Sequence, residues 1–264
     1  MQKNKVTTYL LYAFGEIILV MIGILLALEV NNWNEQQQKR EFESRSLVEI
    51  YNSLKSDSAR ISQWIMPRLN NKKKGINAIG QLLEDRMNYP GDSVFMQAYY
   101  LFDERMQVSI NYGPFEALKG NGLDKISSPE VRYWLIDLYE SLFPRQIDFI
   151  KLNIEATEPV IQDAQRALFK PVAFKGENGN YNTYTLPKSK NILTEELFIE
   201  LFRAEQRRAE ELDRRTRTMM EAIQKSLAFL RGYFQEQGIE FEIKTVKEVG
   251  IRGLLQDSTS LTNR

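Results

Sequence analysis

The chain begins with a run of apolar residues from Tyr9 to Val30 that contains a single internal acid, Glu16, before Glu29 near its end. About 22 residues at 1.5 Å rise give a helix of roughly 33 Å, which matches the hydrocarbon core of a bilayer. A secretory signal peptide would have a shorter apolar region, about 7–15 residues, and a small-x-small cleavage site. The run continues into a polar segment without such a site. It therefore predicts a transmembrane anchor rather than a cleaved signal.

The flanks of this span carry the residues that mark a membrane interface. Tyr9 and Tyr12 lie at one end and Trp33 at the other, where amphipathic rings sit at headgroup level. Basic residues flank both ends, so the positive-inside rule alone gives no clear orientation. Lys3 and Lys5 lie nearest to the span and have no acids beside them. This favours an amino terminus in the cytoplasm.

Glu16 lies on one face of the predicted span. At 100° per residue, the same face carries Ala13, Val20, Gly23 and Ala27. Gly23 and Ala27 form a small-xxx-small pair, which allows two helix backbones to approach closely. Three interpretations of Glu16 remain open: a hydrogen bond between subunits, snorkelling toward the headgroups, or proton or ion conduction. The position of the acid on the small-residue stripe favours contact between subunits.

Beyond the span, apolar residues recur at alternating four- and three-residue intervals over positions 47–83. This period predicts a helical stalk leaving the bilayer and ending near Arg86, with a kink before Pro67. Ser58 and Lys72 occupy positions in this rhythm that are otherwise apolar. The stalk is therefore expected to bury one face along most of its length.

A second long periodic run covers residues 194–237, with Thr194 as its expected N-cap and Gly238 as its end. Its reach is comparable to that of the stalk, so we expect the two helices to pair antiparallel within a bundle. Its charges alternate in sign, which is typical of a solvated face; they include Arg207, Arg208, Glu210, Glu211, Arg214 and Arg215.

Shorter helices fill the middle of the chain. A helix near 94–106 is aromatic-rich, which indicates core packing, and Asp92 or Ser93 is its expected cap. Another begins at Pro114 and stops at the glycines of "KGNG". Further signals predict a helix capped by Ser128 and ended by Pro144, a helix over 145–169, a polar loop with a short hairpin near 170–193, and a strand in "IEFEIKTV".

The predicted fold class is mainly all-α: a transmembrane helix continues into a stalk and is followed by an extracytoplasmic antiparallel helical bundle. The expected division of the chain is a short cytoplasmic tail at 1–8, the transmembrane helix at 9–31, the stalk at 32–90, the helical domain at 91–245 and a C-terminal tail at 246–264.

Composition narrows the chemistry. The chain has no His and no Cys, which removes the ordinary zinc, haem and iron–sulfur sites and thiol or Ser–His–Asp catalysis. Its 35 basic and 35 acidic residues balance, so charge gives no argument for nucleic acid. Glu116, Lys119 and Asp124 form either a small polar site or helix caps. We expect no cofactor, no metal and no enzymatic activity, although enzymes that use only carboxylates, Lys or Tyr pass this filter.

Two blocks of the sequence resemble a known family. The block from Gly15 to Glu35, "GEI…IG…AL…NNWNE", and the block from Glu116 to Leu123, "EALKGNGL", are similar to an uncharacterised family of single-pass membrane proteins common in Bacteroidota. The resemblance implies a bacterial inner-membrane protein with its amino terminus in the cytoplasm and a helical domain in the periplasm. It implies no activity, cofactor or catalytic residue.

Three functions fit these observations. The first is a homo-oligomeric scaffold or accessory protein of the cell envelope, associating through the stripe and stalk, contacting the lipid bilayer and other envelope proteins. The second is a proton-coupled motor subunit that uses Glu16, by analogy of layout. The third is a periplasmic sensor that binds a ligand between helices and acts through a separate partner.

Overall fold

The computed structural model describes residues 4–175 and 180–239. The predicted tail at 246–264 and the expected strand in "IEFEIKTV" lie outside these residues. The elements in chain order are α1 (Asn4–Arg60), the π-helix η1 (Ile61–Ile65), α2 (Met66–Glu84), α3 (Asp92–Phe102), α4 (Gly113–Gly122), the 3-10 helix η2 (Leu123–Lys125), α5 (Pro129–Ile136), the π-helix η3 (Asp137–Leu142), α6 (Phe143–Leu168), β1 (Phe169–Lys175), β2 (Tyr181–Pro187), the 3-10 helix η4 (Ile192–Thr194) and α7 (Glu196–Gln237). The predicted, mainly helical fold is confirmed, and so is the hairpin.

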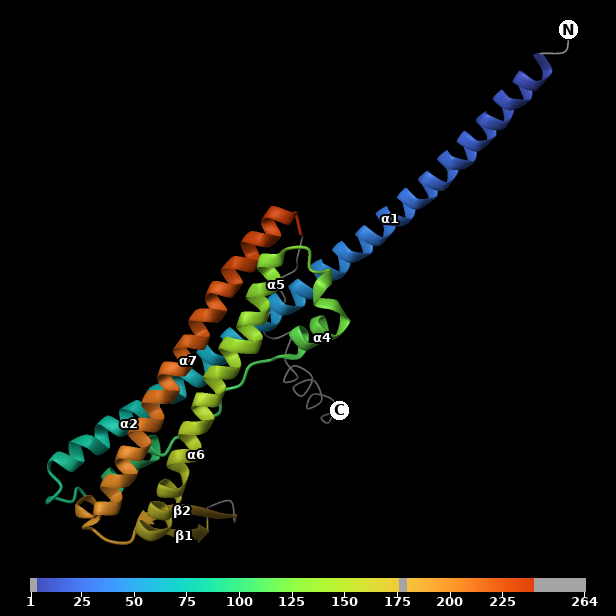
Figure 1. Ribbon diagram of the computed structural model, residues 1–264. Coiled ribbons are helices and arrows are strands. Elements are labelled where there is room, and N and C mark those ends of the chain that lie inside the picture. Colours follow the sequence, from blue (N-terminus) through green and yellow to red (C-terminus); the bar gives the residue numbers. More distant parts are fainter. Residues whose placement is uncertain (1–3, 176–179, 240–264) are drawn as a thin grey trace, which may run out of the picture.

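The first half of α1 projects away from the rest of the molecule (Figure 1). Every residue from Tyr9 to Glu41 is exposed, and the bundle begins at Glu43. The buried Glu43 carboxylate accepts hydrogen bonds from the hydroxyls of Tyr233, at 2.7 Å, and Ser127, at 3.0 Å. These two bonds fix the point at which α1 leaves the bundle.

Three long helical runs form the bundle: α1–η1–α2, α5–η3–α6 and α7. Figure 1 shows α7 running back along the other two, and α7 contacts α6, α1 and α2. The apolar positions predicted to face inward do so, because a 3.6-residue helix places them on one stripe. They include Leu47, Leu54, Ile61, Leu69 and Ile79 on the first run and Leu201, Leu212, Met219, Leu230 and Phe234 on α7.

Prolines are accommodated in two long runs instead of ending them. The expected helix end at Pro144 is wrong: α5 widens into the π-helix η3 and continues directly as α6. Pro144 occupies the first turn of α6, where its missing N–H requires no partner. Pro67 holds the same position in α2, immediately after the π-helix η1. Where a kink was expected before Pro67, the helix widens into the π-helix η1 and continues.

Two predicted caps also differ. The helix expected at 94–106 is α3, which begins at Asp92 after Gly91, a residue with φ of 94° and no side-chain cap. Thr194 ends η4 instead of capping α7, and its hydroxyl donates to the carbonyl of Asn191 at 2.8 Å. Gly238, in the left-handed conformation, ends α7 as predicted. Gly91, whose positive φ few other residues adopt, thus stands before α3 in place of a residue with a capping side chain.

The hairpin and α3 close the end of the bundle opposite to the projecting helix (Figure 1). β1 and β2 pair antiparallel, with Phe169 opposite Pro187. Phe169 brings an aromatic ring against Phe95 and Tyr99 of α3, the latter at 4.3 Å between ring centroids. Phe95, Tyr99 and Phe102 of α3 thus form core, as predicted, whereas Tyr100 is exposed.

Ser128→Ala is expected to lower the free energy of unfolding by about 1 kcal/mol, because the Ser128 hydroxyl accepts a hydrogen bond from the first turn of α5, at Val131 N. The midpoint of urea unfolding measures the change. Ser141→Ala, at an exposed position of the same helical run, serves as the control and should leave the midpoint nearly unchanged. Equal midpoints for both variants would contradict the cap.

Candidate functional site

The predicted transmembrane residues lie along the exposed part of α1. Ala13, Glu16, Val20, Gly23 and Ala27 face one side of this single helix and are all exposed. Within the described part of the chain, Glu16 makes no hydrogen bond or ion pair. The stripe therefore has no partner among the residues that the structure describes.

The expected interface residues occupy the same projecting helix. Tyr9 and Tyr12 are 76% exposed and Trp33 is 66% exposed. None of the apolar segment of this helix is buried against the rest of the described chain. By length and composition this helix is able to cross a membrane. Signal sequences and soluble core helices pass the same test, but a core helix would be buried.

The small polar site considered at Glu116, Lys119 and Asp124 does not form. Lys119 pairs instead with Glu140, with Nζ and Oε1 2.6 Å apart. Glu116 lies in the first turn of α4, and Asp124 lies within η2. These residues stabilise local structure at the surface.

The main polar feature of the bundle is a buried ion pair between α2 and α7. Lys72 Nζ lies 2.7 Å from Glu205 Oε2, and the side chains are 2% and 1% exposed. The same ammonium donates a hydrogen bond to the carbonyl oxygen of Phe102, at 2.7 Å. Burying two charges costs several kcal/mol for each ion unless they compensate one another. Lys72 and Glu205 therefore each depend on the other to remain charged inside the bundle.

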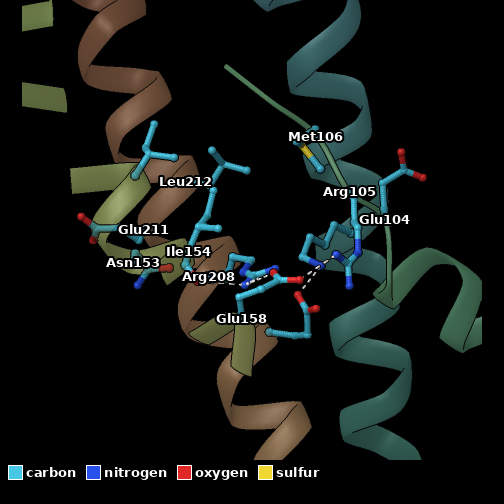
Figure 2. Close-up of a pocket in the computed structure, with 12 residues that line it drawn as sticks. Glu104, Arg105, Met106, Asn153, Ile154, Glu158, Arg208, Glu211 and Leu212 are labelled. Atoms are coloured by element: carbon cyan, nitrogen blue, oxygen red, sulfur yellow. Dashed lines mark hydrogen bonds and ion pairs between the residues drawn. The ribbon is translucent and has the colours of Figure 1, made fainter. Parts of the chain in front are cut away.

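A second ionic group surrounds Glu158 on α6. Arg105, just after α3, and Arg208, on α7, approach the Glu158 carboxylate at 3.2 Å and 2.9 Å (Figure 2). Arg208 also donates to the hydroxyl of Thr157, at 2.9 Å. One carboxylate thus joins three parts of the fold.

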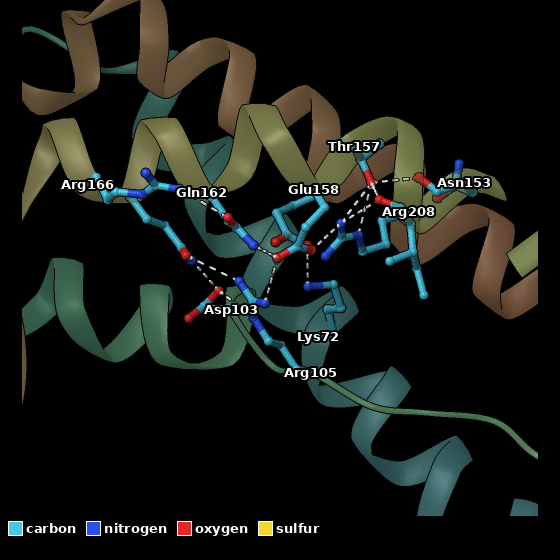
Figure 3. Close-up of polar contacts among 12 residues, drawn as sticks. Lys72, Asp103, Arg105, Asn153, Thr157, Glu158, Gln162, Arg166 and Arg208 are labelled. Atoms are coloured by element: carbon cyan, nitrogen blue, oxygen red, sulfur yellow. Dashed lines mark hydrogen bonds and ion pairs between the residues drawn. The ribbon is translucent and has the colours of Figure 1, made fainter. Parts of the chain in front are cut away.

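The polar contacts continue along α6 toward the hairpin end of the bundle (Figure 3). Gln165 donates to Asp103 Oδ1 at 2.7 Å and accepts from Arg105 at 3.2 Å. Gln162 donates to Glu158 at 2.8 Å. This network fixes the end of α3 against α6.

Burial and pairing set the protonation of these acids in opposite directions. Burial raises the pKa of Asp103, although Arg105 and Lys72 act against it. Burial also acts to raise the pKa of Glu158, but hydrogen bonds from Gln162, Arg208 and Arg105 outweigh it, so this pKa lies below its usual value. Glu158 is therefore ionised at neutral pH.

A cavity of about 180 Å³ lies among these charges. Figure 2 shows Arg105 and Met106 on one side, and Ile154, Arg208 and Leu212 on the other. Lys72 and Glu205 also line it. The volume is that of roughly six water molecules at about 30 Å³ each. The bundle core is therefore not completely filled at its most polar point.

The chemistry of this site favours binding. Among the described residues, no group of three or more acidic, His or Cys side chains is placed to hold a metal ion. The basic side chains that line the cavity are each engaged by a carboxylate. A site of this kind can hold a small molecule in one orientation, because its polar groups are fixed in place and the cavity limits the shape of what enters.

Sequence reasoning did not identify this cluster, although one signal was visible. Lys72 was noted in an otherwise apolar rhythm, and it is buried. Glu205 follows Leu201 by one helical turn and occupies the same inward stripe of α7. The assignment of Arg208 and Glu211 to a solvated face is wrong, since their side chains are only 11% and 16% exposed. They were misassigned because α6 covers that face of α7.

Comparison with known proteins identifies one family. A model described as "Family of unknown function (DUF6090)" matches residues 16–148. The match begins at Glu16, covers α1 to the start of α6, and includes Lys72 and Arg105 but not Glu158, Glu205 or Arg208. No curated protein and no solved structure matches the chain.

Proposed function

We propose that this chain, which belongs to the DUF6090 family of unknown function, is a self-associating membrane-anchored scaffold or accessory protein of the cell envelope. Its helical bundle would lie outside the cytoplasm, in the periplasm of a bacterial inner membrane. The single observation that carries this proposal is the exposed apolar half of α1, which stands clear of the bundle (Figure 1).

The exposed apolar surface of α1 requires a covering. Each large apolar side chain left in water forgoes about 1.5–3 kcal/mol relative to burial. Contiguous apolar surfaces of this kind mark membrane or protein contacts. A bilayer covers a helix of this length, and Tyr9, Tyr12 and Trp33 then lie at its two interfaces.

Continuity of α1 supports an anchor over a removable signal. The helix runs without a break from Asn4 to Arg60, so cleavage after the apolar run would cut regular helix. Residues 31–41 are exposed and, apart from Trp33, polar, with a side-chain hydrogen bond from Asn31 to Glu35 at 3.0 Å. This segment of roughly 16 Å would hold the bundle clear of the membrane surface.

Self-association would use the stripe of Ala13, Glu16, Val20, Gly23 and Ala27. An added Cβ at Gly23 meets no atom within 4 Å, so this position is free to accept a second helix. Small residues allow such close approach in lipid. A carboxyl group at Glu16, costly to leave unpartnered in lipid, would gain a hydrogen-bond partner from the other copy.

Gly23→Ile is expected to remove most of the crosslinked oligomer in native membranes, because the new side chain separates the helices while clashing with nothing in its own chain. Gly15→Ile is the matched control. Gly15 also has no atom within 4 Å of an added Cβ but lies about 100° away from Glu16, off the stripe. Glu16→Gln should preserve oligomer size, because an amide still hydrogen-bonds. A wild-type chain that stays monomeric would refute self-association.

Two alternatives are separated by other measurements. A proton-coupled motor subunit predicts that Glu16→Gln abolishes proton flux while assembly remains intact, and unchanged flux would reject it. A ligand receptor acting through a partner requires a pocket in the bundle. The cavity beside Glu205 supports this second candidate.

A further inference from the structure

The cavity between α2, α6 and α7 has a closed inner end and an open outer end. Glu205 and Lys72 are 1% and 2% exposed at the inner end, whereas Arg105 is 48% exposed at the outer end. A molecule entering beside Arg105 would therefore reach Glu205 last. This arrangement places the most buried acid at the bottom of a pocket.

Two buried acceptors of this pocket have no hydrogen bond among the described residues. Lys72 is engaged by Phe102 O and the Glu205 carboxylate, and Arg208 by Thr157 and Glu158. In contrast, Glu205 Oε1 is buried without a hydrogen bond, while Oε2 lies 2.7 Å from the Lys72 ammonium.

A second buried acceptor lies on the facing helix. Asn153 Oδ1, on α6, is also buried without a hydrogen-bond partner, and Asn153 lines the same cavity (Figure 2). Unpartnered buried acceptors are rare and energetically costly. The pocket is thus complementary to a molecule that donates several hydrogen bonds.

We infer that this pocket binds a small alkylammonium ion, a primary amine carrying a short apolar chain. Its ammonium group offers three N–H donors and a positive charge for Glu205 and Asn153. Its alkyl chain would contact the apolar wall formed by Ile150, Ile154 and Leu212. The volume of about 180 Å³ admits a short chain and excludes a lipid.

An anion fits the same pocket poorly. The surrounding arginines and Lys72 already have carboxylate partners, so an incoming carboxylate or phosphate would have to displace one of them. It would also stand beside the Glu205 carboxylate, where like charges repel. The side chains of the pocket therefore favour a positively charged molecule that donates hydrogen bonds.

This assignment deepens the receptor alternative and rests on it. It does not depend on association of the membrane helices. Loss of amine binding and loss of crosslinking are separate measurements, so either proposal can fail while the other stands.

The test is isothermal titration calorimetry of the full-length chain in detergent micelles with n-butylammonium as the probe. Three compounds serve as controls: 1-butanol has the chain without the charge, butyrate has the opposite charge, and tetramethylammonium has the charge without N–H donors. We expect saturable binding of one butylammonium per chain and binding at least about tenfold weaker for each control.

Asn153→Leu is the decisive variant, because it removes a side-chain acceptor that no group in the described part of the chain uses. It should weaken butylammonium binding about tenfold or more and leave the unfolding midpoint unchanged. Asn153→Asp should tighten binding by adding negative charge. Asn70→Leu, at an exposed position of α2, is the matched control and should bind like the unaltered chain.

Three results would overturn the assignment. They are no butylammonium binding at millimolar concentration, which would leave a pocket filled only by water; equal binding of butyrate or tetramethylammonium; and unchanged binding by Asn153→Leu. Because Asn153→Leu should remain folded, loss of binding in that variant cannot be attributed to unfolding.

Discussion

Glu205→Leu is expected to lower the free energy of unfolding by about 3–5 kcal/mol, because it leaves the ammonium of Lys72 buried without its countercharge. Lys72→Met should cost a similar amount by leaving the Glu205 carboxylate alone. Chemical unfolding of the full-length chain in mild detergent, followed by tryptophan fluorescence, measures both changes.

The double variant Lys72→Met/Glu205→Leu distinguishes a charge effect from a packing effect. It removes both charges together, so its cost should fall to about 1–3 kcal/mol, the penalty for the Phe102 carbonyl that loses its donor. A double variant whose loss equals the sum of the two single losses would show that the residues do not interact. Lys72 and Glu205 would then not compensate each other's buried charge.

The contrast between Lys72 and Glu205 shows how far the sequence specifies this site. The apolar rhythm of residues 47–83 is local information, and it correctly predicted both the helix and its buried face. Lys72 interrupts that rhythm, so its burial was accessible from the sequence. Glu205 also falls on the inward stripe of α7, but the many exposed charges of that helix make it hard to distinguish from a solvated residue.

The partners of these charges depend on which helices meet. Arg208 would be solvated on an isolated α7, and it is covered only because α6 packs against that face. Likewise, proline commonly follows the end of a helix, yet Pro144 lies in the first turn of α6 after a π-helical segment. Such outcomes depend on which helices pack together, and the hydrophobic periodicity of one segment carries no information about its neighbours. Membership in a family of unknown function was predicted from two short blocks and is confirmed.

Gly75→Ala is expected to destabilise the bundle by about 3 kcal/mol or more, at the upper end of the range for overpacking. A Cβ at Gly75 would lie 2.1 Å from Phe102 N, 2.4 Å from Leu101 C and 2.6 Å from Phe102 Cα. These are backbone atoms of α3, so no side-chain rotation relieves the clash. The two helices must separate, and Phe102 must leave its place in the core. Unfolding midpoints in urea measure the effect.

Gly80→Ala on the same helix is the matched control, and it should change stability in the opposite direction. Its Cβ would meet only Phe202 Cζ, at an ordinary 3.6 Å, and alanine stabilises a helix interior by about 0.5–1 kcal/mol relative to glycine. The two substitutions therefore have the same intrinsic helix effect and differ in what the methyl group meets. If Gly75→Ala were also neutral or stabilising, α3 could not be seated on α2 as described. The carbonyl of Phe102 would then not be held against Lys72, and the inner end of the cavity would be open.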